Sequence, residues 1–216
     1  MPTIAVIDYG MGNLHSVAKA LEHVAPEARV TVTGEAAAVR AADRLVFPGQ
    51  GAIGQAMEAL ARSGLDEVVR GLFGRRPFLG ICLGLQALMR RSEEDGGTAG
   101  LGLLPGEVRR FPHGLREPAT GVRLKIPHMG WNRVHQELAH PLWEGIGQDE
   151  RFYFVHSYYV ALEPPPGRVA ATTDYGLRFA AAVAGPAAFA VQFHPEKSQR
   201  AGLRLLANFA RWDGEG

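Results

Sequence analysis

FLGICLGLQ, residues 78–86, is the stretch that decides the fold. Its opening apolar run is typical of a buried strand, and it passes directly into Gly-x-Cys-x-Gly and then into a helical pattern. Gly80 and Gly84 permit a sharp turn at Cys82 that a β-carbon would block. This arrangement predicts a nucleophile elbow, which would expose the sulfur of Cys82 at the carboxyl edge of a sheet.

Strand and helix patterns alternate on both sides of this stretch in the first half of the chain. Short apolar runs predict strands at residues 3–8, 30–33, 44–47 and 77–81. Helical spacing of apolar residues predicts helices at residues 14–24, 52–61, 65–72 and 83–91. Alternation of this kind implies right-handed crossovers and a parallel sheet.

The second half of the chain has a different character. Its runs are strand-like, namely EVRRF, RFYFVHSYYV, RVAATTDY, and the pair FAAAVAG and PAAFAVQF around a Gly-Pro turn. They predict antiparallel additions to the sheet or a second small sheet. Residues 92–105 read as a loop, and a helix is expected at about 198–212. The predicted fold is α/β, an open, mostly parallel sheet flanked by helices with antiparallel strand additions in the second half, in one domain over residues 1–216.

Composition excludes several classes of protein and site. The 216 residues include 23 basic and 22 acidic side chains, so the net charge of +1 gives no general reason to expect nucleic acid or an anionic membrane as partner. One cysteine, Cys82, excludes an internal disulfide and a thiolate-rich metal site. The opening MPTIAVIDYG lacks the pattern of a secretory signal, and no apolar run reaches the roughly 20 residues of a membrane helix. We therefore expect a cytoplasmic protein.

Cys82 has two interpretations. A lone cysteine is most often a buried structural residue. Here the predicted elbow places it at a helix N-terminus, where the dipole and free N–H groups favour a thiolate. The N–H of Leu83 would point to where an oxyanion forms. The context therefore favours a nucleophile.

A cysteine nucleophile needs a base, and the base needs a group that orients it. His194 follows an apolar strand pattern and is separated from Glu196 only by a proline. The two side chains can lie against each other, and the carboxylate would then fix the imidazole tautomer. A surface His-Pro turn is the alternative, and the elbow makes it the less favoured one.

The segment PGQG, residues 48–51, also follows a predicted strand. Its glycines would let backbone N–H groups at Gln50 or Gly51 approach a ligand as a second oxyanion donor. Taken alone, the segment is more simply a strand-to-helix turn.

No cofactor or metal is expected. GMG at residues 10–12 is not a dinucleotide fingerprint. Four histidines lack the spacing of metal ligands, and these are His128, His135, His140 and His156.

Several motifs together carry a resemblance to a known family. FLGICLGLQ with the distant QFHPEKS, residues 192–198, resembles the class I glutamine amidotransferases. DYGMGNL, FPGQGA, PHMGWN at 127–132 and FVHSYY at 154–159 are similar to the glutaminase subunits of imidazole glycerol phosphate synthases. The resemblance covers roughly residues 4–210.

The resemblance implies an activity and a partner. Glutamine would be hydrolysed to glutamate and ammonia. The ammonia would pass to a separate (β/α)8-barrel cyclase subunit, which makes imidazole glycerol phosphate and an aminoimidazole carboxamide ribonucleotide in histidine biosynthesis. We also expect the glutaminase to be nearly idle alone and to be activated when a nucleotide on the partner shifts the 48–51 loop.

The resemblance also implies roles for individual residues. Cys82 would form the glutamyl thioester, with His194 as base and then acid and Glu196 behind it, and the oxyanion would meet the N–H groups of Leu83 and of Gln50 or Gly51. The implied substrate-binding residues are Gln86, Glu94, Ser157 and Tyr158. The implied partner-interface residues are Asn13, Trp131, Tyr153 and Lys197. The family usually has an aromatic residue where this chain has Ile53, and often valine where it has Gln50.

Three alternatives stay open from the sequence. One is the glutaminase of another amidotransferase, such as that of pyridoxal phosphate, anthranilate or guanylate synthesis, against which PHMGWN and VHSYY argue. Another is an independent cysteine amidase or peptidase. The last is a degenerate regulatory subunit, against which the intact Cys82, His194 and Glu196 argue.

Overall fold

Parallel strands form one half of the sheet. The computed structural model describes residues 1–163 and 165–215. Neighbouring strands run parallel in the order β2-β1-β3-β4-β13. Their bounds are Arg29–Thr33 (β2), Thr3–Ile7 (β1), Arg44–Gly49 (β3), Phe78–Cys82 (β4) and Ala188–Val191 (β13). The predicted parallel sheet is confirmed, and the carboxyl ends of these strands meet at one edge.

Antiparallel strands extend the sheet beyond β13. The order continues β12-β10-β7-β5-β6, and a second branch, β11-β8-β9, leaves from β12. Every pairing in these two runs is antiparallel except that of β5 with β7. The bounds in the first run are Arg178–Gly185 (β12), Tyr158–Val160 (β10), Glu107–Arg110 (β7), Arg91–Ser92 (β5) and Thr98–Ala99 (β6). Those in the branch are Arg168–Asp174 (β11), His128–Gln136 (β8) and Glu150–His156 (β9).

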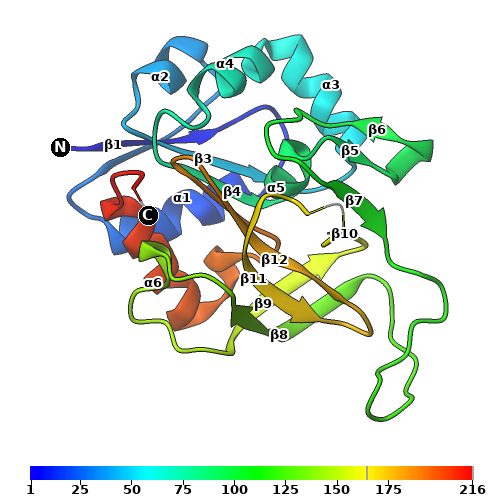
Figure 1. Cartoon of the computed structure of the whole chain (residues 1–216). Coiled ribbons are helices and arrows are strands. Elements are labelled where there is room, and N and C mark those ends of the chain that lie inside the picture. Colours follow the sequence, from blue (N-terminus) through cyan, green and yellow to red (C-terminus); the bar gives the residue numbers. More distant parts are fainter. Residues whose placement is uncertain (164, 216) are drawn as a thin grey trace.

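Helices cover both faces of the parallel half. In Figure 1, α2, α3 and α4 lie above the sheet, and α1 and α6 lie below it. The bounds are Leu14–Val24 (α1), Ala36–Ala41 (α2), Ile53–Ser63 (α3), Leu65–Leu72 (α4), Leu83–Leu88 (α5) and Gln199–Arg211 (α6). Because both faces are covered, the central strands are apolar along their whole length, as the sequence indicated.

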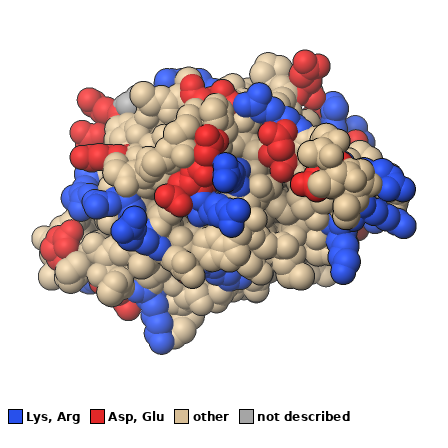
Figure 2. Space-filling view, turned by 90° about the horizontal axis from the view of Figure 1, so that it is seen from below, with Lys and Arg blue, Asp and Glu red and all other residues tan. Residues whose placement is uncertain are grey.

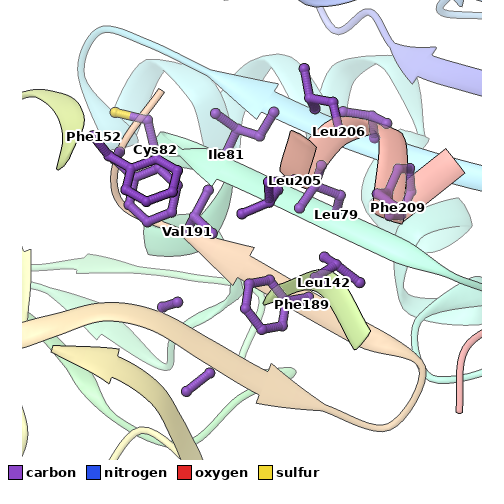
Figure 3. Packing of buried hydrophobic residues seen from close by; sticks show 14 of the residues in the cluster. Leu79, Ile81, Cys82, Leu142, Phe152, Phe189, Val191, Leu205, Leu206 and Phe209 are labelled. Atoms are coloured by element: carbon purple, nitrogen blue, oxygen red, sulfur yellow. The ribbon is translucent and has the colours of Figure 1, made fainter. Parts of the chain in front are cut away.

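Two buried clusters form the core, one on each face. Alternate residues of β4 point to opposite sides, so Phe78 packs in the cluster under α3 and α4 while Leu79 and Ile81 pack in the cluster with α6. Figure 3 shows the second cluster, in which Leu205 and Phe209 of α6 lie over Leu79. Cys82 lies at the end of this cluster, so the strand that carries the sulfur is held by packing along its whole length.

The predicted helix at 83–91 is wrong in its second half, because α5 ends at Leu88. The carbonyl groups of its last turn accept hydrogen bonds from a returning segment, including Leu101 N to Ala87 O at 2.7 Å and Leu104 N to Leu88 O at 2.9 Å. Residues 91–92 then form β5 instead. The expected loop at 92–105 therefore contains β6 and a 3-10 turn at Glu94–Gly96 as well.

Other boundaries also depend on packing. The expected strand at 44–47 continues through Gly49, because Pro48 and Gly49 stay in register with β4. The expected single run at 151–160 is two strands that part at Ser157 and pair with different partners. The expected strand pair around the Gly-Pro turn is antiparallel, as β12 and β13, and β13 also pairs in parallel with β4. Helix α2 had no strong periodic signal and was not expected.

Charge is mixed on the outer surface. Figure 2 shows lysine and arginine side chains interspersed with aspartate and glutamate on one face of the molecule. That face has no extended region of a single sign, in agreement with a net charge of +1.

Candidate active site

The elbow forms where β4 meets α5. Cys82 has φ 55° and ψ −109°, a backbone conformation that side chains rarely adopt. It is the last residue of β4 and directly precedes α5. The turn holds the sulfur at the carboxyl edge of the sheet, as predicted. Strain of this kind is typical of functional sites.

Two glycines let neighbouring strands approach the elbow. A β-carbon on Gly84 would overlap the carbonyl oxygen of Phe47 in β3. One on Gly80 would lie 2.9 Å from the β-carbon of Ala190 in β13. Both glycines are therefore required by close packing on the two sides of β4, in addition to the turn itself.

His194 and Glu196 lie against each other, as their spacing predicted. Nδ1 of His194 is 2.8 Å from Oε1 of Glu196, and their side chains are 4% and 1% exposed. The backbone of this turn is fixed to β9, because His194 N donates to Tyr153 O at 2.9 Å and Tyr153 N donates to the Ser198 hydroxyl at 2.9 Å. Nε2 of His194 is buried with no hydrogen-bond partner among the described residues. This nitrogen is therefore available for proton exchange with a reacting group.

Electrostatics favour a charged His194. Burial alone would lower its pKa, but attraction to the sulfur of Cys82 and the hydrogen bond with Glu196 outweigh burial and raise the pKa to about 10. The negative sulfur also contributes, after burial, to raising the pKa of Tyr9 above its ordinary value. The arrangement therefore favours the imidazolium form of His194 beside the sulfur of Cys82.

A cavity of about 840 Å³ opens over Cys82. His194 lines it from one side, and the turns after β1 and β3 line it from another. Its lining includes nearly all the sequence-predicted catalytic and substrate residues, namely Cys82, Leu83, His194, Gln50, Gly51, Gln86, Glu94, Ser157 and Tyr158. Glu196 stands behind His194.

Glu94 is half-buried at the cavity wall. Its Oε2 accepts a hydrogen bond from Ile53 N at 3.0 Å, which ties the wall to the start of α3. Burial raises the pKa of this carboxyl, the nearby Asp95 adds to the rise, and the Ile53 N–H opposes it. A carboxylate in this place can pair with a ligand's ammonium group.

Comparison with known proteins settles the family. The sequence profile described as "Glutamine amidotransferase class-I" matches residues 5–212. The chain belongs to the class I glutamine amidotransferases.

Two similar amidotransferase proteins align with nearly the whole length of this chain. The protein named "Imidazole glycerol phosphate synthase subunit HisH" from Methylococcus capsulatus is 61% identical over 214 residues, which are 99% of this chain and 98% of that protein. The protein of the same name from Aromatoleum aromaticum is 59% identical over 212 residues, covering 98% and 99%.

Solved structures share the amidotransferase fold. One described as "Crystal structure of glutamine amidotransferase" superposes with a TM-score of 0.68 at 20% identity, over 96% of this chain and 98% of that one. "Structure of PurLQS from Thermotoga maritima" gives 0.69 at 16% identity, over 96% and 97%. At these identities the likeness concerns the fold alone.

Gln86, an expected substrate-binding residue, makes its side-chain hydrogen bonds within the protein. It lines the cavity but is buried, and its Nε2 donates to Tyr158 O at 2.8 Å and to Gln192 Oε1 at 3.0 Å. Its amide hydrogens are thus already paired within the protein.

Sequence reasoning missed several residues around the cavity. Met11 and Gln55 line the cavity. Nε2 of the buried Gln192 lies 3.8 Å from the sulfur of Cys82. His156 lines the cavity as well and bonds to His128, a pair that spacing rules for metal ligands had set aside. The signal for Met11 was present, because the turn after β1 ends at the same edge of the parallel sheet as Cys82.

The four expected interface residues do not line this cavity. Trp131 is 43% exposed and packs edge-on against Tyr153, with ring centroids 6.0 Å apart. Lys197 belongs to the 3-10 turn Pro195–Lys197, which contacts both α1 and β9. Asn13 immediately precedes α1.

The described residues, 1–163 and 165–215, show neither a cluster of metal ligands nor a membrane-spanning helix. They hold no group of three or more His, Cys, Asp or Glu side chains placed to bind a metal ion. No helix within them is long and apolar enough to cross a membrane.

Proposed function

We propose that this chain is the glutaminase subunit of an imidazole glycerol phosphate synthase and acts in histidine biosynthesis. The observation that carries the proposal is the elbow cysteine in a cavity of about 840 Å³ beside the buried His194–Glu196 pair. The near full-length identity of 61% and 59% to proteins of that name supports this member of the family over other amidotransferases.

The first half of the reaction makes a thioester. The thiolate of Cys82 attacks the side-chain amide carbon of glutamine, and the amide oxygen becomes an oxyanion. The N–H of Leu83 and that of Gln50 or Gly51 would stabilise this charge. His194 donates its proton to the amide nitrogen, the C–N bond breaks, and ammonia leaves.

Water completes the cycle. His194, now neutral, takes a proton from water, and the resulting hydroxide attacks the thioester carbonyl. The carbon–sulfur bond breaks, glutamate leaves, and the thiolate–imidazolium pair is restored. Glu196 holds Nδ1 of His194 throughout, so that Nε2 faces the reacting atoms.

Substrate recognition uses the cavity wall. Glu94 would pair with the α-ammonium of glutamine, while the Ser157–Tyr158 segment would contact its backbone groups. Gln86 acts by holding the Tyr158 carbonyl in place.

Ammonia must reach a second protein. In bulk water near neutral pH it would be protonated and lost, so we propose a cyclase subunit docked over Asn13, Trp131, Tyr153 and Lys197. We place the complex in the cytoplasm, where the lone thiol stays reduced.

Cys82→Ala in the complex with the cyclase subunit tests the division of labour. Glutamine-dependent product formation should fall by at least about 10⁴-fold, because the nucleophile is removed. Synthesis from ammonium salts should continue at the wild-type rate, because it needs only the partner. Loss of both activities would contradict the proposal.

Glutamate release by the wild-type chain, alone and with the nucleotide-loaded partner, separates this function from an independent amidase. We expect slow release alone and strong stimulation by the loaded partner. Equal, rapid release in both conditions would favour the independent amidase.

A further inference from the structure

We propose that Gln192 is a further catalytic residue, whose side-chain amide donates a hydrogen bond to the sulfur of Cys82 and stabilises its thiolate. The inference rests on the proposed glutaminase function and assigns a new role within it. Gln192 lies two residues before His194, where the chain leaves β13.

Gln192 reaches the sulfur from the interior of the protein. The residue is fully buried, and its Nε2 is 3.8 Å from Sγ of Cys82. Its backbone N–H donates to Ala181 O at 2.8 Å, which fixes the start of the side chain against β12. The amide is therefore held in place and is not a solvent-exposed group that happens to pass the sulfur.

The direction of the amide is set by Gln86. One acceptor of the Gln86 Nε2 group is the Tyr158 carbonyl, and the other is Gln192 Oε1. Turning the Gln192 amide over would bring two NH₂ groups together and would point an oxygen at a negative sulfur. Because both changes are unfavourable, the N–H of Gln192 faces Cys82.

A buried histidine pair holds the other end of this network. Nδ1 of His156 donates to Tyr158 O at 2.8 Å, and Nε2 of His156 lies 2.9 Å from Nδ1 of His128. Burial lowers the pKa of His128 to about 4. Burial, together with electrostatic repulsion from His128, lowers the pKa of His156 to about 3. Each neutral ring has one N–H, so the donors run from His128 to His156 to the Tyr158 carbonyl.

The sulfur needs a permanent donor. Beside His194 and Gln192, the sulfur also lies 4.0 Å from the carbonyl oxygen of Val155, which can accept a hydrogen bond from a thiol but repels a thiolate. His194 gives up its proton to the leaving ammonia during the reaction. The amide of Gln192 loses no proton, so it supports negative charge on sulfur whenever the thiolate is present.

Alkylation of Cys82 by iodoacetamide across a range of pH tests the inference. Cys82 is the chain's one cysteine, so the rate reports this sulfur alone. Gln192→Met keeps the length of the side chain and removes the donor. We expect the midpoint of the rate profile to rise by about one pH unit, so that alkylation is about tenfold slower at pH values below the wild-type midpoint. In the complex, kcat should fall by a similar factor with little change in KM.

Further variants keep the test decisive. Gln192→Glu also removes the donor and should shift the midpoint upward at least as far. Among the described residues, the other titratable groups that line the cavity or act on its sulfur are His194, Glu94, His156, Tyr158 and Tyr9. Gln148→Glu adds the same charge at an exposed position before β9 that does not line the cavity, and it should leave the midpoint near the wild-type value.

The outcomes separate the inference from the function beneath it. Upward shifts in both Gln192 variants, with Gln148→Glu unchanged, support the inference. Unshifted midpoints in folded Gln192 variants, while the wild-type complex hydrolyses glutamine, overturn the inference alone. A wild-type complex that does not hydrolyse glutamine overturns both.

Discussion

Individual residues in this protein are placed by long-range packing and tuned by their immediate neighbours. Cys82 is strained, His194 is fixed by Tyr153 and Glu196, and Glu94 is tied to the start of α3. Nearby groups shift the pKa values of His194 and Glu94. Their pH dependence is therefore the most direct test at this scale.

Glu94 should make glutamine binding sensitive to mild acid. Its raised pKa means that it takes up a proton at a higher pH than an ordinary glutamate, and a neutral carboxyl cannot pair with the substrate's ammonium. KM for glutamine should therefore rise as the pH falls towards this pKa, while Glu94→Gln should have a high KM that no longer varies over this range. Initial rates of glutamate release at a series of pH values measure both. A KM that is flat in the wild type would contradict the assigned role.

Helix α5 is short but packs closely against the centre of the sheet. It has only six residues, all of them buried. The carbonyl groups at its C-terminal end accept hydrogen bonds from the segment around Leu101. It lies directly against β3 through Gly84. The elbow thus depends on a short helix that the surrounding chain holds in place.

Gly84→Ala should weaken this contact. The added methyl group would overlap the carbonyl oxygen of Phe47, so β3 and α5 must move apart. We expect the free energy of unfolding to fall by about 2–3 kcal/mol in urea titrations.

Gly71→Ala is the matched control, because its β-carbon would enter open space on the exposed side of α4. It should be neutral or raise the free energy of unfolding by up to about 1 kcal/mol. Equal losses in the two variants would argue against the close-packing account.

At the scale of the whole molecule, the proposed catalytic residues and the proposed partner-binding residues lie on neighbouring elements. The turn that carries His194 and Glu196 continues into Lys197 and then α6. The same turn contacts β9, whose Tyr153 packs on the exposed Trp131 of β8. A partner docked on Trp131 would therefore lie close to the catalytic histidine.

Trp131→Ala should weaken binding of the cyclase subunit by about 30-fold or more, since large exposed aromatic residues often dominate interfaces. Calorimetric titration gives the Kd. The melting temperature of the free subunit should hardly change, because the side chain is partly in solvent.

Val32→Ala provides the comparison, as Val32 is 39% exposed on the edge strand β2 at the far end of the parallel sheet. It should leave the Kd unchanged. An unchanged Kd for Trp131→Ala would place the interface elsewhere.

Local sequence by itself determined much of this protein. Apolar periodicity located the parallel strands β1 to β4 and the main helices, because burial of one face leaves its mark within a few residues. Flanking glycines identified the elbow at Cys82, and a spacing of two residues predicted the contact of His194 with Glu196. These features depend on neighbours along the chain, so their signal is present in the sequence.

Only the tertiary structure decided the rest. It set β13 between β4 and β12, ended α5 at Leu88, and brought Gln192 to the sulfur across 110 positions of sequence. It also brought the side chains of His128 and His156 together as a buried, hydrogen-bonded pair. Such contacts join segments that share no local pattern, and they form only when the apolar faces of distant elements pack into one core.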